Sequence, residues 1–115
     1  MNKIYIAHPF GGDQENVERV QDIITDLVKR NPEVVYVSPL HMFGHLYDVV
    51  SYEQGMEWCL EILQGCDAIV FASDEWYKSQ GCCMEYEFAK ENGIQVFTLP
   101  EYVDELDEAD IAYYI

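Results

Sequence analysis

Four short apolar runs along the chain predict the strands of a sheet. Each run is apolar almost throughout, rather than alternating between apolar and polar residues. This pattern is typical of strands that are buried on both faces of a parallel sheet. The four expected strands cover residues Lys3–Ala7, Val34–Ser38, Ala68–Ala72 and Gln95–Leu99.

The segments between these runs show helical spacing. In the first, an apolar stripe recurs every three to four residues and includes Val17, Val20, Ile23, Ile24, Leu27 and Val28. Asp13 and Ser51 are typical residues before a helix, and Asn31-Pro32, Gly65 and Asn92-Gly93 are typical of helix ends. The expected helices run from Asp13 to Asn31, from Ser51 to Gly65 and from Gly81 to Asn92, with a further short helix over Val103–Ala109.

This alternation of strands and helices predicts an α/β fold. A chain of 115 residues suits one domain, so we expect residues 1–115 to form a single doubly wound domain of the Rossmann or flavodoxin type. Its mainly parallel four-stranded sheet should have the order 2-1-3-4, with helices on both faces. Ligands bind such sheets at the carboxyl ends of the strands. The segments 8–12, 39–43 and 73–81 should therefore face one pocket.

Charge and composition narrow the classes of partner. The chain has 22 acidic and 6 basic side chains and a formal net charge of −16, which disfavours nucleic-acid polymers. A small anion remains compatible, because helix N-termini and glycine-rich turns bind phosphate through backbone N–H groups. No apolar stretch approaches the roughly 20 residues needed to cross a membrane. The first residues lack the features of a signal peptide, so we expect a cytoplasmic protein.

The four cysteines give no indication of a metal site. Cys59, Cys66, Cys82 and Cys83 have none of the spacings of zinc ribbons or fingers. We expect reduced thiols packed as small apolar side chains, and neither metal nor organic cofactor.

Glu85 is the leading candidate for chemistry. It lies in the first turn of the third expected helix, where side chains lean toward the N-terminus and thus toward the ligand-binding edge. The positive end of the helix favours an ionised carboxylate, which suits a nucleophile or an acceptor for a sugar hydroxyl. Alternatively, Glu85 only complements the helix dipole.

Other candidates lie in the loops at the same edge. Gly11-Gly12, and Ser79 with Gly81, precede helices and form modest candidates for phosphate-binding turns. His8 and His41 are equally compatible with structural roles. Trp76 and Tyr77 either stack on a base or sugar, cover the core, or fill a subunit interface.

Two segments resemble the nucleoside 2-deoxyribosyltransferase superfamily, which includes nucleoside 5′-monophosphate N-hydrolases. They are I-Y-I-A-H-P-F-G-G at 4–12 and S-Q-G-C-C-M-E-Y-E-F-A at 79–89. The resemblance extends over nearly the whole chain and is greatest to the uncharacterised bacterial and phage branch. It implies that Glu85 attacks the anomeric carbon of the sugar and that Tyr5 orients Glu85. Ser79 corresponds to a serine that contacts phosphate in the hydrolases.

The sequence also departs from that superfamily. Cys59 stands where the family has its general acid, an aspartate, so protonation of the leaving base would need Asp74 or water. Phe10 stands where the hydrolases have a basic residue. The resemblance and the edge loops together give a set of expected substrate-binding residues: His8, Pro9, Phe10, Gly11, Gly12, Asp74, Trp76, Ser79 and Gly81.

These observations predict a protein that binds a nucleoside or nucleotide and cleaves or transfers at its N-glycosidic bond. The alternative is a non-catalytic module that sequesters or senses a nucleotide-derived ligand, and a third option is an interaction domain with an acidic surface. We also expect a homodimer or higher homo-oligomer. The resemblance implies dimers, and the apolar residues Trp58, Ile62 and 112–115 lie outside the main apolar stripes.

Overall fold

A parallel four-stranded sheet forms the centre of the molecule in the computed structural model, which describes residues 3–114 and their side chains as far as residue 108. The strand order β2-β1-β3-β4 confirms the order predicted from the sequence. All three strand pairs are parallel. The strands are β1 (Lys3–Ala7), β2 (Val35–Val37), β3 (Ala68–Phe71) and β4 (Gln95–Thr98).

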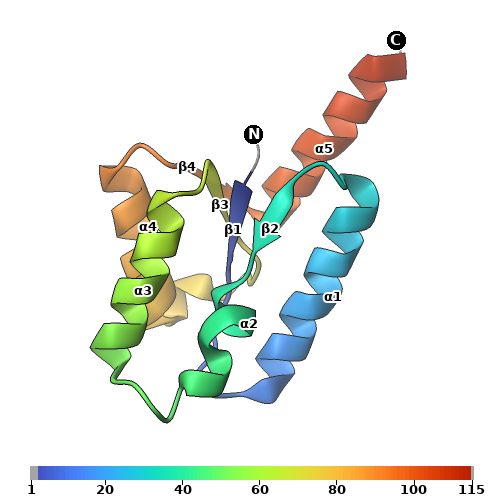
Figure 1. Ribbon diagram of the computed structural model, residues 1–115. Coiled ribbons are helices and arrows are strands. Elements are labelled where there is room, and N and C mark those ends of the chain that lie inside the picture. The colour runs from blue at the N-terminus through green and yellow to red at the C-terminus, as the bar shows by residue number, and fades with distance from the viewer. Residues whose placement is uncertain (1–2, 115) are drawn as a thin grey trace.

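Helices cover both faces of this sheet, as the predicted doubly wound architecture requires (Figure 1). α1 and α5 lie on one face, and α3 and α4 lie on the other. The α-helices are α1 (Gln14–Arg30), α2 (Pro39–Phe43), α3 (Tyr52–Gln64), α4 (Gln80–Glu91) and α5 (Leu99–Tyr114), with short 3₁₀ turns η1 (Gly44–Leu46) and η2 (Trp76–Lys78). No helix among residues 3–114 is both long and apolar enough to span a membrane.

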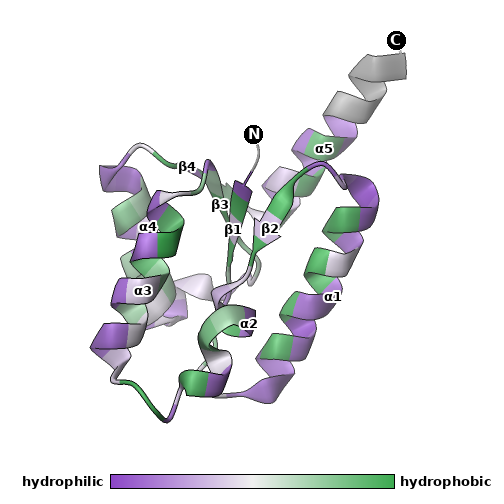
Figure 2. Cartoon of the chain, in the orientation of Figure 1, coloured by the Kyte–Doolittle hydropathy of each residue, from purple (hydrophilic) through white to green (hydrophobic). Residues whose placement is uncertain are grey.

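The central strands divide their side chains between two apolar clusters. In β1, Ile4 and Ile6 belong to the cluster beneath α1 and α5, whereas Tyr5 and Ala7 belong to the cluster beneath α3 and α4. This division follows from the alternation of side chains along a strand. Figure 2 shows the apolar strands at the centre and hydrophilic residues on the outer side of α1. Tyr5 is thereby directed toward α4, which carries Glu85.

Two helices differ from the sequence expectations. Residues 39–43, expected as a loop, form α2, because Ser38 accepts a hydrogen bond from the His41 N–H and Pro39 occupies the first turn. The last helix begins at Leu99 instead of Val103 and continues to Tyr114. Thr98 and Glu101 form a reciprocal capping pair that starts it and ends β4 at Thr98.

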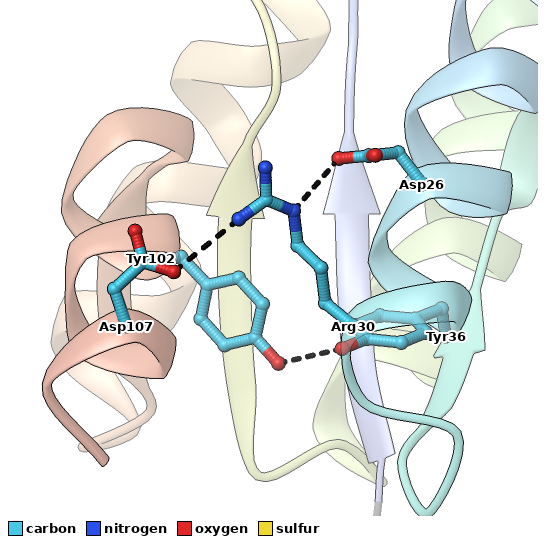
Figure 3. A network of polar contacts seen from close by, with 5 residues as sticks. All are labelled: Asp26, Arg30, Tyr36, Tyr102 and Asp107. Carbon is cyan, nitrogen blue, oxygen red and sulfur yellow. Dashed lines mark hydrogen bonds and ion pairs between the residues drawn. The ribbon is translucent and has the colours of Figure 1, made fainter. Parts of the chain in front are cut away.

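Polar contacts attach α5 to α1 and to β2 (Figure 3). The Arg30 guanidinium contacts Asp26 on its own helix at 3.0 Å and Asp107 of α5 at 3.3 Å. The hydroxyls of Tyr36 and Tyr102 are 2.8 Å apart and share a hydrogen bond. Both ion pairs are exposed, so the hydrogen bond between half-buried Tyr36 and buried Tyr102 and the apolar contacts of α5 contribute most of its attachment.

Candidate functional site

A cavity of about 370 Å³ lies at the carboxyl end of β1, between the start of α4 and the segment that joins α2 to α3. Its volume is in the range of small-molecule sites. The wall is mostly apolar and includes Phe10, Leu40, Phe43, Val50 and Met56. The segments that follow β1, β2 and β3 all contribute residues, so the predicted common pocket forms.

Tyr5 and Glu85 form a hydrogen-bonded pair at the base of this cavity. The Tyr5 hydroxyl donates to Glu85 Oε2, although the two residues are 80 positions apart in the sequence. Tyr5 is fully buried in β1, and Glu85 is 7% exposed in α4 and lines the cavity. The carboxylate is therefore held in one orientation by a neutral donor.

Burial controls the ionisation of this pair. Desolvation raises the pKa of Glu85 from 4.5 to about 7, and the hydrogen bond from Tyr5 opposes that rise. Burial and the neighbouring Glu85 raise the pKa of Tyr5 well above 10. The same two causes raise the pKa of the Cys59 thiol to about 11 and that of Cys82 to about 12. The thiols are neutral near pH 7, and Glu85 titrates there.

His8 contributes a buried ring nitrogen to the cavity. Its Nδ1 lies 2.8 Å from the Pro9 carbonyl oxygen, which only accepts hydrogen bonds, so Nδ1 is the donor. The neutral ring then carries a lone pair on Nε2, which is buried and has no hydrogen-bond partner among the described residues. Burial lowers the pKa of His8, which favours the neutral ring.

The helix N-termini at the cavity are capped by their own serines. Ser79 accepts a hydrogen bond from the Cys82 N–H at 3.2 Å, and Ser51 accepts one from the Gln54 N–H at 3.1 Å. Both serines line the cavity. Their caps use backbone donors that an anion would otherwise contact.

The turn before α1 packs against an aromatic side chain. Gly11 and Gly12 have φ angles of 59° and 77°, a region that favours glycine. A Cβ on Gly12 would lie 2.9 Å from the Tyr47 ring, and that ring packs edge-on against Phe10 with centroids 5.2 Å apart. The glycine pair thus allows the turn to approach the segment that closes the cavity.

The structure brings most of the expected site residues together. Those that line the cavity are His8, Phe10, Gly11, Ser79, Gly81, Glu85 and Cys59, and Tyr5 joins them through Glu85. Among the described residues, Pro9, Gly12, Asp74 and Trp76 do not line it. Asp74 is exposed, and Trp76 packs against Phe71 and Tyr86, with ring centroids 4.6 and 5.1 Å apart. Trp76 therefore covers the core, one of the alternatives left open by the sequence.

Sequence reasoning missed the segment between α2 and α3. Tyr47 and Val50 of this segment line the cavity together with Tyr52, the first residue of α3. The side chain of Tyr52 would lie 3.3 Å from a Cβ on Gly81. The signal was a cluster of apolar and aromatic residues without helical or strand spacing. Tyr47 and Tyr52 are 48% and 47% exposed, so the mouth of the cavity is aromatic.

A second hollow of about 700 Å³ lies along the edge strand β2 and shares no residue with the cavity. Ile62 lines this hollow, and Trp58 packs against Phe43, with ring centroids 5.4 Å apart. The side chains of 112–115, which were expected at an interface, lie outside the described residues. Within the described part of the chain, no group of three or more His, Cys, Asp or Glu side chains could hold a metal ion.

Comparison with known proteins gives one family and a shared fold. The family model described as "Domain of unknown function (DUF4406)" matches residues 2–98. A solved structure, a 2-desoxiribosyltransferase from Leishmania mexicana, is similar with a TM-score of 0.61 and 21% identity. The match covers 85% of this chain and 63% of that one, so it extends over less than two thirds of that protein's length. No curated protein shows significant sequence similarity to this chain.

Proposed function

Because the chain belongs to the family described as DUF4406, whose description assigns no activity, we propose a function from its cavity: cleavage or transfer at the N-glycosidic bond of a nucleoside or nucleotide. The observation that carries this proposal is the buried Glu85 carboxylate, oriented by Tyr5 in a cavity of suitable size. The fold shared with a 2-desoxiribosyltransferase gives independent support. The expected setting is the cytoplasm.

A carboxylate in this position suits a two-step reaction. In the first step, a Glu85 oxygen bonds to the anomeric carbon while the bond from that carbon to the base breaks. The transition state resembles an oxocarbenium ion, which the adjacent negative charge stabilises. In the second step, water or another base attacks the same carbon and releases Glu85. The Tyr5 hydrogen bond favours the ionised, nucleophilic form and holds it in position.

The departing base needs a proton. Asp74 is exposed and does not line the cavity, and the Cys59 thiol, with its pKa raised to about 11, is a weak acid. Water entering by the cavity mouth is therefore the expected proton source. This mechanism suits bases that leave readily and predicts a modest rate.

One observation favours a second candidate, a module that binds the same class of ligand without turnover. Among the described residues that line the cavity, Glu85 is the single carboxylic acid, and Cys59 occupies the position where the resemblance implies an acid. A site without a general acid can still bind through its apolar wall and Glu85. In this case Glu85 accepts a hydrogen bond from a sugar hydroxyl.

Base release from a panel of nucleosides and 5′-monophosphates tests the proposal. Wild type and Glu85→Gln are incubated with each compound, and free base is measured by chromatography. Glutamine is nearly isosteric but forms no glycosyl ester, so turnover should fall by several orders of magnitude. Glu87→Gln removes an exposed carboxylate from the same helix and should retain full activity.

Two results would contradict the proposal. An active Glu85→Gln protein would exclude Glu85 as the nucleophile. A wild type that binds a panel member but releases no base would establish the binding module instead. Stabilisation on adding the ligand would detect such binding, because a ligand selective for the folded state raises the free energy of unfolding.

A further inference from the structure

The cavity contains no cationic side chain. None of the described residues that line it is Lys or Arg, and its charged group is the Glu85 carboxylate. The whole chain has a formal net charge of −16. A phosphate monoester carries between one and two negative charges near pH 7. Placed in this cavity, it would meet like charge and no neutralising partner.

Backbone donors compensate for this absence only in part. At α4 and α3, Ser79 and Ser51 already accept from N–H groups of the first turn. At α1 the cap is Asp13, whose carboxylate accepts from the Glu15 N–H and adds negative charge. At each of these helix ends one N–H group is thus taken by a side chain of the chain itself, which leaves fewer backbone donors for a phosphate.

His8 adds a specific polar requirement. It is 6% exposed, lines the cavity, and has an unpartnered Nε2 whose lone pair can only accept a hydrogen bond while the ring is neutral. A buried acceptor without a partner is costly, so a bound molecule that donates to it is favoured. A sugar hydroxyl can donate this hydrogen bond. In a 5′-monophosphate only the hydroxyls on the sugar ring keep that ability, because a phosphate dianion has no proton to give.

We propose that the ligand of this cavity is an uncharged nucleoside, one of whose hydroxyl groups donates to His8 Nε2, and that 5′-monophosphates are excluded. This inference rests on the proposed function and narrows its ligand class. It assigns His8 as a specificity-determining residue. Ser79, which the sequence resemblance associates with a phosphate, acts instead as the cap of α4.

Arg19 is the cation that could oppose this selectivity. It is close enough to lower the pKa of His8 but does not line the cavity, and its guanidinium donates to Asn16 Oδ1 at 3.0 Å. If a monophosphate reached Arg19 from the cavity, its affinity would depend on that side chain. Arg19→Gln is therefore included in the test.

C-nucleosides allow binding to be measured without turnover, because their base is joined to the sugar by a carbon–carbon bond. Calorimetry with wild type compares formycin and pseudouridine with their 5′-monophosphates. We expect at least one nucleoside to bind, and its monophosphate to bind about tenfold more weakly or worse. Equal or tighter binding of the monophosphate, whether or not Arg19→Gln abolishes it, would overturn the proposal.

Substitutions at His8 test the acceptor. His8→Asn keeps a donor near the position of Nδ1 but has no atom at the position of Nε2. It should weaken nucleoside binding by about 3- to 10-fold, the usual effect of losing one hydrogen bond. His8→Gln, which can place an amide oxygen near Nε2, should retain most of the affinity. His45→Asn, an exposed site outside the cavity, is the matched control.

Analogues that lack the 2′-, 3′- or 5′-hydroxyl complete the test. One analogue should bind wild type more weakly than the parent nucleoside does. That same analogue should bind His8→Asn as well as it binds wild type, because the hydroxyl that would donate to His8 is already missing. If no analogue behaves in this way, or if His8→Asn binds the nucleoside as wild type does, the assignment of His8 is wrong. Should the His8 variants fail to fold, the wild-type comparisons of analogues and monophosphates still decide.

The inference and the proposed function can fail separately. Selective nucleoside binding without base release from the matching N-nucleosides would support the inference and contradict the catalytic function. Base release with no preference for nucleosides would contradict the inference alone. Failure of every nucleoside and monophosphate to bind would contradict both.

Discussion

Replacing Glu85 with glutamine should make the fold less sensitive to alkaline pH. The folded protein raises the pKa of this carboxyl from 4.5 to about 7 because the group is buried. Between these values the folded state binds more protons than the unfolded state. The free energy of unfolding therefore falls as pH rises through this window. Glutamine has no proton to lose, so the variant lacks this component.

The two pKa values set the size of the effect. At about 1.4 kcal/mol per pH unit, a rise from 4.5 to about 7 corresponds to roughly 3 to 4 kcal/mol over the full range. Between pH 5 and pH 8.5, wild type should lose roughly 2 to 3 kcal/mol that Glu85→Gln does not lose. Any constant effect of the amide on the Tyr5 hydrogen bond cancels in this comparison.

Urea unfolding at the two pH values measures the difference directly. Wild type, Glu85→Gln and the exposed control Glu87→Gln are compared, because the other acidic residues contribute the same pH dependence to all three. We expect the difference in free energy of unfolding between wild type and Glu85→Gln to change by roughly 2 to 3 kcal/mol from pH 5 to pH 8.5, in favour of the variant. A gap that changes by less than about 0.5 kcal/mol would refute the argument that burial controls Glu85.

Two further predictions concern the pair and the assembly. Base release should increase with pH through about 7, as Glu85 ionises. The Tyr5 hydrogen bond lowers the pKa of Glu85, so Tyr5→Phe should raise that pKa and move the rise in base release to higher pH. A pH profile of kcat/KM that does not move would contradict this role for Tyr5. We expect a homodimer, because apolar side chains such as Val35 (58% exposed) and Val49 (74% exposed) lie on the surface. Light scattering at tens of micromolar protein should give about twice the 13.4 kDa of one chain, and the mass of a monomer would contradict this prediction.

The sequence was most informative where burial is uniform. Continuous apolar runs predicted the strands because strands covered on both faces have little choice of residue. The alternation of these strands with helices then predicted the sheet order correctly. Helix α2 was missed and the start of α5 was misplaced, although both have local signals: Ser38-Pro39 starts α2, and Thr98-Leu99-Pro100-Glu101 is a capping box with a proline in the first turn. These signals are short, and the apolar pattern around them resembled a strand end or a loop.

The site was predictable in part for a different reason. Glu85 was identified from its place in the first turn of a helix at the ligand-binding edge. Its pairing with Tyr5 came from resemblance to a family, since no local pattern relates residues 80 positions apart. The aromatic mouth was not predictable, because Tyr47 is positioned by Gly12 and Phe10 through tertiary packing alone. Trp76 is the opposite case. Its place in an edge loop suggested a ligand contact, yet its ring packs against Phe71 and Tyr86.

The central place of β1 constrains the order in which the chain can fold during synthesis. β1 leaves the ribosome before its neighbours β2 and β3, which follow about 30 and 65 residues later. Tyr5 meets Glu85 only when α4 has emerged. Contacts so distant in sequence close slowly. Until then β1 exposes two unpaired edges and an apolar sequence, the state in which nascent chains pair wrongly. The many acidic side chains, which repel other copies of the chain, reduce that hazard while the sheet is incomplete.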